Sequence, residues 1–125
     1  MRQNISSGSP WEEPVGYSRA VRIGSVVEVA GTTAQDGDAV TGRTVYEQTR
    51  RALEKIEEAL TAAGASLTDV VRTRIFTTDI SQWAEIGRAH GEFFRLIRPA
   101  ATMVEVRALI APELLVEIEA TAVIS

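Results

Sequence analysis

Cysteine is absent from the 125 residues, and histidine and lysine occur once each, as His90 and Lys55. The lack of cysteine excludes disulfides, a thiol nucleophile and thiolate metal ligands, and one histidine cannot build a usual zinc site. No apolar run approaches the ~20 residues that a membrane-spanning helix needs. The N-terminal segment MRQNISSGSPWEEP also lacks the apolar core of a secretory signal. We therefore expect a cytoplasmic protein with no membrane partner and no metal.

Positive charge is sparse and scattered along the chain. Thirteen Lys and Arg residues stand against 17 Asp and Glu, which gives a formal net charge of -4. An acidic chain is not drawn to phosphate backbones, so no nucleic-acid partner is expected. The 45% of apolar and 24% of charged residues are ordinary for a folded protein. A chain of this length predicts one domain over residues 1–125, with an irregular N-terminal arm over 1–16.

The first half of the chain predicts a β-hairpin followed by a helix. Gly24 and Ser25 form a pair suited to a tight turn between two strands. Gly31 interrupts the second strand, where a glycine marks a bulge, a place of close backbone approach or a plain strand end. Thr44 and Glu47 form a capping box that starts the helix. Gly64 is placed to end it.

The second half predicts a strand, a helix and two more strands. The segment VVRTRIFTTDI is β-branched and places Val71, Thr73, Ile75 and Thr77 on one side. Asp79 or Ser81 can cap the helix, which must end before Pro99. Its expected apolar stripe is Trp83, Ile86, Phe93, Phe94 and Ile97.

Two final strands, ATMVEVRAL and LLVEIEATAVI, complete an α+β fold of order ββ-α-β-α-ββ. In the last strand, one face is continuously apolar and consists of Leu114, Val116, Ile118, Ala120, Ala122 and Ile124. The other face is mixed. Two helices suffice to cover one face of one sheet, so the mixed face is left open. That open face predicts a homo-oligomer.

No familiar catalytic constellation is present, and any site must consist of carboxylates, arginines, hydroxyls and backbone groups. Glu117 and Glu119 share one face of the last strand. If that face lines a cleft, burial would raise a carboxyl pKa and suit it to proton transfer; otherwise both are ordinary surface carboxylates. His90 has no partner nearby in the sequence, which favours either packing in the second helix or exposure over a catalytic role.

Several strings together resemble the RidA (YjgF) family, the reactive intermediate deaminases, over essentially the whole chain. They are GY at 16–17, VEVAG at 27–31, LTAAGASLTDVVRTRIFTTDI, the FF at 93–94 and RPAATMVEVRALIAPELLVEIEA. The resemblance implies a chorismate-mutase-like fold with two helices on one face of a mixed sheet. It also implies a homotrimer with ligand sites in the clefts between subunits, and no cofactor.

The resemblance implies site residues and also marks departures from the family pattern. Tyr17 matches a pocket tyrosine, Gly31 a glycine bordering the ligand, and Glu117 a glutamate that places or activates water. The family motif Pro-Ala-Arg-Ser, whose arginine holds the substrate carboxylate, here ends in Ala101 and Thr102. Met103 replaces a family cysteine.

Further replacements bear on how the ligand is held. Ala30 replaces the family serine before the strand glycine. Arg74 is a candidate to replace the missing clamp, although a surface or interface salt bridge is its simpler role. Arg107 lies ~20 Å along the strand from Ala101, too far to reach the same spot.

Three functions follow as hypotheses. The first is hydrolysis of an imine, an enamine or a related metabolite other than the usual 2-aminoacrylate type. Glu117 would be catalytic, and Tyr17, Gly31, Ala101, Thr102 and Met103 would line the substrate site. The second is a non-catalytic trimer that binds a small ligand. The third, ribonuclease activity or translation inhibition, is disfavoured by the acidic composition.

Overall fold

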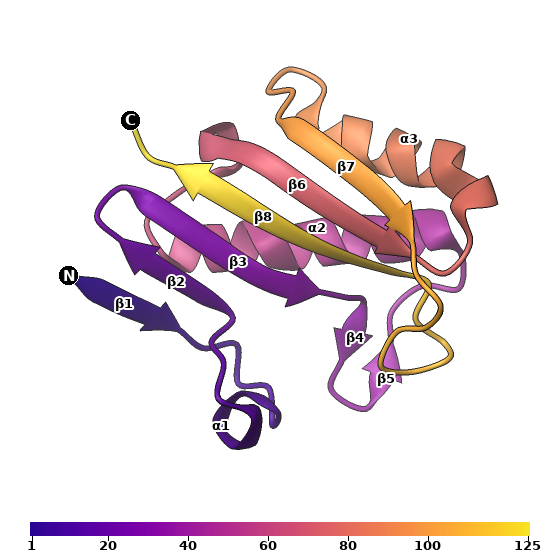
Figure 1. Cartoon of the computed structure of the whole chain (residues 1–125), viewed down its shortest axis with the longest axis horizontal. Coiled ribbons are helices and arrows are strands. Elements are labelled where there is room, and N and C mark those ends of the chain that lie inside the picture. Colours follow the sequence, from indigo (N-terminus) through magenta and orange to yellow (C-terminus); the bar gives the residue numbers. More distant parts are fainter.

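One mixed sheet of six strands organises the protein, for which the computed structural model describes all 125 residues (Figure 1). The strand order is β1-β2-β3-β8-β6-β7, and only β6 and β7 run parallel. Both long helices, α2 and α3, lie behind the sheet in this view. The predicted α+β class, with two helices on one face of a mixed sheet, is confirmed.

The predicted strands and helices occur in the predicted order, and several short elements occur in addition. The sheet strands are β1 (Arg2–Ile5), β2 (Ala20–Ile23), β3 (Val26–Thr32), β6 (Val70–Thr77), β7 (Ala100–Glu105) and β8 (Val116–Val123). The helices are α1 (Glu12–Val15), α2 (Val45–Ala62) and α3 (Trp83–Phe94). A separate hairpin, β4 (Gln35–Asp36) with β5 (Ala39–Val40), joins β3 to α2.

Local sequence signals set the ends of α2 as predicted. The Thr44 hydroxyl accepts from the Glu47 amide at 3.1 Å, and the Glu47 carboxylate accepts from the Thr44 amide at 3.1 Å. At the other end, Gly64 adopts φ +84°, a conformation that costs a glycine little. Gly24, at φ +59°, likewise permits the turn between β2 and β3.

The core lies between α2, α3 and the near side of the sheet, here called the helix face. Alternate residues of β8 enter it, because successive side chains of a strand point to opposite faces. Burying each large aliphatic or aromatic side chain contributes ~1.5–3 kcal/mol. The largest fully buried apolar side chains of the core are Val27, Leu53, Ile56, Leu60, Ile86, Phe94, Leu114, Val116 and Ile118.

The arm predicted as irregular over residues 1–16 contains two ordered elements instead. β1 pairs antiparallel with β2 through four residue pairs, and α1 forms one short helical turn. Only the Ile5 side chain of β1 packs against the core, so the apolar alternation that identifies a strand is missing there. Glu12 fixes the arm by accepting from the Ser7 amide and hydroxyl, at 3.0 and 2.6 Å.

Two side chains that were expected inside lie outside. A register shift between Val70 and Arg72 makes Val70 the buried residue and leaves Val71 47% exposed. Trp83, the first residue of α3, follows a short 3-10 turn, Ile80–Gln82, and is 62% exposed. Asp79 caps that turn, and its carboxylate accepts from the Ser81 amide at 3.0 Å.

Candidate functional site

The side of the sheet away from the helices, here called the open face, carries the charged residues of β6 and β8. Arg74 and Glu119 form an ion pair there at 3.7 Å, and both are more than a third exposed. The simpler role expected of Arg74, a surface salt bridge, is therefore the one that the structure gives it. Glu117 lies one alternate position away from Glu119 along β8 and is more deeply buried.

Glu117 packs directly on the backbone of β3 at Gly31. The pairing of β3 with β8 passes from Val29 opposite Ala120 to Thr32 opposite Ile118, so β3 has one residue more than β8 in this interval. A Cβ atom at Gly31 would overlap the Oε2 atom of Glu117 and lie 3.0 Å from its Cδ atom. Of the interpretations of Gly31, the bulge and the close approach are both observed, and the approaching group is Glu117.

Arg19 is a member of this region that sequence reasoning missed. Its Nη1 atom donates to the Gly31 carbonyl at 2.6 Å and to the Thr32 hydroxyl at 3.0 Å. Its Nη2 atom lies 3.5 Å from the Tyr17 hydroxyl, and the guanidinium carbon is 5.7 Å from the centre of the Tyr17 ring. No short-range pattern in the sequence indicates these contacts, because Arg19 lies in the segment before β2 and reaches residues 12 and 13 positions away.

The pKa of Glu117 is raised above its ordinary value. Burial is the main cause, since a low dielectric disfavours the charged form. The positive charge of Arg19 opposes the shift, and the negative charge of Glu119 adds to it. Arg19 does not form an ion pair with Glu117, because its Nη1 atom bonds to β3 instead. A carboxyl group with its pKa raised in this way is better suited to general acid–base chemistry than an exposed one.

The structure brings together only half of the predicted site residues. Tyr17, Gly31 and Glu117 surround Arg19 on β3, β8 and the segment before β2. Ala101, Thr102 and Met103 lie on β7 at one edge of the sheet, with β6 and β8 between them and β3 (Figure 1). Within one chain, these two groups of residues therefore lie apart and do not form a single site.

The three β7 residues also do not share one face. Thr102 is opposite Arg74, and its hydroxyl accepts from Arg72 Nη2 at 2.9 Å, which places it on the open face. Ala101 and Met103 are in register with Thr73 and Ile75, two buried residues of the helix face. Ala101 is nevertheless exposed, because it lines a recess between α3 and β7.

His90 has a partner that the sequence did not reveal. Its Nε2 atom lies 2.9 Å from the Thr73 hydroxyl, and its ring is 4.7 Å from the ring of Phe94. Burial lowers its pKa, because the imidazolium form would lose hydration there. Of the packing and the exposure expected for His90, packing agrees with these contacts.

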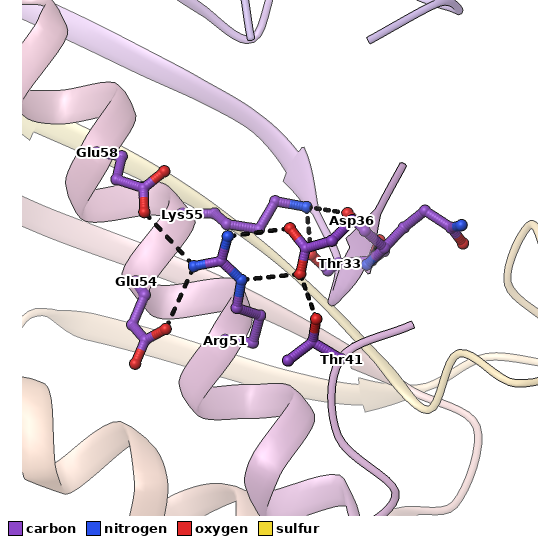
Figure 2. A network of polar contacts seen from close by, with 8 residues as sticks. Thr33, Asp36, Thr41, Arg51, Glu54, Lys55 and Glu58 are labelled. Atoms are coloured by element: carbon purple, nitrogen blue, oxygen red, sulfur yellow. Dashed lines mark hydrogen bonds and ion pairs between the residues drawn. The ribbon is translucent and has the colours of Figure 1, made fainter. Parts of the chain in front are cut away.

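A polar network fastens the β4–β5 hairpin to α2 (Figure 2). Arg51 donates to both oxygens of Asp36 at 2.9 Å, in the bidentate geometry that makes such pairs strong. Lys55 donates to the carbonyls of Thr33 and Gln35 at 2.8 and 2.5 Å. Arg51, the main cause, lowers the pKa of Asp36 to about 2. This network fixes the chain that leaves Gly31 and returns to α2.

No group of three or more His, Cys, Asp or Glu side chains is positioned to hold a metal ion. None of the helices combines the length and the apolar character needed to cross a bilayer. The groups available for chemistry are thus the Glu117 carboxyl, the Tyr17 and Thr102 hydroxyls, arginines and the backbone.

Comparison with known proteins identifies the family. A family model described as Endoribonuclease L-PSP matches residues 11–124. A crystal structure of Rv2704 from Mycobacterium tuberculosis, a member of the YjgF/YER057c/UK114 family, is 58% identical; the match covers 99% of this chain and all of that one, with a TM-score of 0.93. A RutC family protein of Pyrococcus abyssi is 38% identical over 114 residues, 88% of each chain. The mitochondrial protein mmf2 of Schizosaccharomyces pombe is 37% identical over 101 residues, 80% of this chain and 75% of its own. The chain therefore belongs to the RidA (YjgF) family.

Proposed function

We propose that this protein hydrolyses the C=N bond of a small imine, or of the enamine in equilibrium with it, without a cofactor. The observation that carries the proposal is the Glu117 carboxyl, which has a raised pKa and packs against the Gly31 backbone next to Arg19. A partly buried carboxyl group without an ion-pair partner contributes little to stability. It is, however, suited to accept a proton from water and return it.

The reaction needs one water molecule and one group that moves protons. Glu117 takes a proton from water as the oxygen adds to the carbon of the protonated imine, whose nitrogen becomes an amine. The protonated Glu117 then donates its proton to that nitrogen. As the C–N bond breaks, the new hydroxyl group gives its proton to Glu117, ammonia leaves, and a carbonyl compound remains; ammonia or water then takes the proton from Glu117. Tyr17 and Thr102 contribute hydroxyl groups that orient the substrate, and Gly31 lets it approach the backbone.

A complete site requires more than one copy of the chain. Tyr17, Gly31 and Glu117 lie on one part of the sheet, and Ala101, Thr102 and Met103 lie on its β7 edge. A homotrimer in which the β7 edge of one subunit meets the open face of the next would join the two groups into three clefts. The exposed apolar side chains of the open face and its rim, among them Val26, Val104 and Val123, support such an association. Light scattering tests it, and a monomeric mass would contradict it.

The substrate differs from the 2-aminoacrylate type because Ala101 cannot hold a carboxylate beside the reacting carbon. An arginine fork on a carboxylate contributes ~1.5–3 kcal/mol for each hydrogen bond. Without it, an imine whose carboxylate is attached directly to the C=N carbon loses its anchor. The substrate either lacks that carboxylate or presents it at another place in the cleft.

Semicarbazide competition tests this specificity. An amino-acid oxidase supplies imines with the carboxylate on the C=N carbon, and an amine oxidase supplies imines without it. Semicarbazide traps both, and a hydrolase lowers the yield of the trapped product. We expect little competition for the first imines and clear competition for the second. Strong competition for the first imines would show that the standard activity is retained.

The second candidate function is binding of a small ligand without catalysis. It is favoured by three exchanges that make the cleft less polar, at Ala30, Ala101 and Met103. Glu117→Ala distinguishes the two functions, because a catalyst loses turnover whereas a binder keeps its affinity. Thermal-shift screening of small oxo and imino compounds would supply the ligand for this comparison.

RNA cleavage is the activity named in the description of the matching family model. The net charge of -4 opposes association with a phosphate backbone, and no pair of basic catalytic residues is present. We therefore do not assign it to this chain. RNA cleavage that Glu117→Ala abolishes would overturn that judgement. The cytoplasm remains our proposed location, although a relative in S. pombe is named mitochondrial.

A further inference from the structure

A recess of about 650 Å³ opens between α3 and the start of β7. It is distinct from the Glu117 region within one chain, and Ala101 forms part of its wall. The charged and titratable side chains that line it are Arg88, His90, Glu92, Arg95 and Arg98. Three cations against one carboxylate give it a positive character, in contrast to the acidic chain as a whole.

The one carboxylate of the recess is already neutralised by other partners. Glu92 accepts from the Tyr46 hydroxyl at 2.7 Å and from Arg50 at 2.6 Å, and Arg88 lies 3.8 Å from its second oxygen. Arg88 in turn pairs with Glu85 at 2.9 Å. These groups form a closed network on the surface of α2 and α3.

Arg95 and Arg98 take no part in that network. The guanidinium groups of both residues are exposed and form neither a hydrogen bond nor an ion pair, whereas most other cations of the chain have such a partner. Their five N–H donors each are therefore available to a ligand at the mouth of the recess. The fork geometry of an arginine matches a carboxylate in two parallel bonds.

The backbone of Arg98 adds a second and independent observation. Arg98 has φ +58° and is the one residue other than glycine with a positive φ. Its amide donates to the Phe94 carbonyl at 2.8 Å, so it occupies the position after a helix end that glycine usually fills. An L side chain is strained in this conformation. A glycine would relieve the strain but would remove the guanidinium from the recess.

We propose that this recess binds the carboxylate of the substrate through Arg98, assisted by Arg95, and thereby replaces the clamp that position 101 lacks. The inference rests on the proposed function and names the substrate class more closely. Arg98 enters the recess from a point three residues before Ala101. The anion is thus held away from the place where a clamp at 101 would hold it. The fitting substrate is an imine whose carboxylate is several bonds from the C=N carbon.

A different explanation for the two arginines is their place at the C-terminal end of α3. Cations near a helix C-terminus interact favourably with the helix dipole, and that role needs no ligand. It predicts that removing Arg98 destabilises the protein. If Arg98 instead serves to bind a ligand, Arg98→Gly should not destabilise the protein, because it relieves the strain of the left-handed backbone and removes only the binding of the anion.

The test measures binding of 4-hydroxybutanoate to the full chain by NMR titration, with 4-hydroxybutanamide as the neutral counterpart. We expect saturable binding of the anion only. Arg98→Gly should weaken it about tenfold or more, as loss of a charge-assisted fork implies, while the Tm stays equal or rises. Arg98→Lys, which keeps the charge but not the fork, should give an intermediate loss. Arg107→Gln removes another exposed arginine without a partner, outside the recess, and should change nothing.

Several results would overturn the inference. One is equal binding of the amide and the anion, and another is unchanged binding in Arg98→Gly. A fall in Tm for Arg98→Gly with no loss of binding would assign Arg98 to the helix end. The readout needs no turnover, so it is separate from the test of hydrolysis. If Arg98 binds the anion but no imine is hydrolysed, the anion site stands and the proposed catalysis fails.

Discussion

Asp36 and Glu117 are both partly buried carboxyl groups close to an arginine, yet their pKa values move in opposite directions. Asp36 receives two hydrogen bonds from Arg51, which lower its pKa to about 2 (Figure 2). Glu117 has Arg19 nearby, but the Nη1 atom of Arg19 bonds to Gly31 and Thr32. Burial therefore dominates and raises its pKa.

The comparison distinguishes a carboxyl group that stabilises the fold from one that is available for acid–base chemistry. The fully paired carboxylate, Asp36, stabilises the link between the β4–β5 hairpin and α2, and it stays ionised at neutral pH. The carboxyl group that is left without an ion-pair partner adds little stability and can exchange a proton. Groups whose environments push their pKa values apart in this way mark acid–base assignments.

The largest effect is expected for turnover in a matched pair of variants. Glu117→Gln should lower the rate of imine hydrolysis by about 100-fold or more, because general acid–base catalysis contributes ~10²–10⁴-fold. Asp36→Asn should leave the rate within about twofold at neutral pH. The measurement is semicarbazide competition with imines that the unmodified protein hydrolyses. Equal losses in the two variants would remove the distinction between them.

A smaller effect is expected for stability in Asp36→Asn. The pKa of Asp36 falls from 3.8 to about 2 on folding, which corresponds to about 2 kcal/mol because one unit is ~1.4 kcal/mol. The folded pKa is the lower one, so this stability is present above pH 3.8 and is lost as the pH falls towards 2. Urea unfolding at pH 7 should show a loss of about 2 kcal/mol in the variant.

The pH dependence of unfolding below pH 4 provides a control for the predicted loss of stability in Asp36→Asn. The difference between Asp36→Asn and the unmodified protein should shrink between pH 4 and pH 2, because Asp36 becomes protonated there. Glu54→Gln removes a weaker partner of Arg51, at 3.3 Å and 46% exposed, and should change stability by less than about 0.5 kcal/mol. A difference that does not depend on pH would point to local distortion rather than to the ion pair.

The sequence predicted the parts of the fold that local rules determine. Thr44 and Glu47 cap α2, Gly64 ends it, and alternation along β8 identifies the buried face, each because the physical cause lies within a few residues. β1 escaped prediction because it forms on an edge, where pairing with β2 replaces burial as the cause.

The candidate site was predicted less completely, for reasons of distance along the chain. Glu117 could be selected from the strand pattern and the resemblance, but its contact with Gly31 joins residues 86 positions apart. Arg19 bonds from the segment before β2 to Gly31 and Thr32 on β3, and no short-range pattern predicts such a contact. The left-handed backbone of Arg98 could be suspected only from Pro99, which excludes a helical conformation before it.

The smallest expected effect is on the stability of Glu117→Gln, and its sign is opposite to that of Asp36→Asn. The pKa of Glu117 is higher in the folded than in the unfolded chain, so folding favours its protonated form. The free energy of unfolding therefore falls as the pH rises from the pKa of Glu117 in the unfolded chain to its higher pKa in the folded chain. It stays lower at neutral pH. Glutamine carries no charge, so the variant should be slightly more stable at pH 7, and the gain should vanish once Glu117 is protonated at low pH. Glu119→Gln, which loses the ion pair with Arg74, should show no such gain in thermal unfolding. If Glu117→Gln is more stable at pH 7 and has lost turnover, the protein retains this carboxyl group for chemistry at a cost in stability. If the variant is less stable at pH 7, ionised Glu117 is stabilised by Arg19 instead.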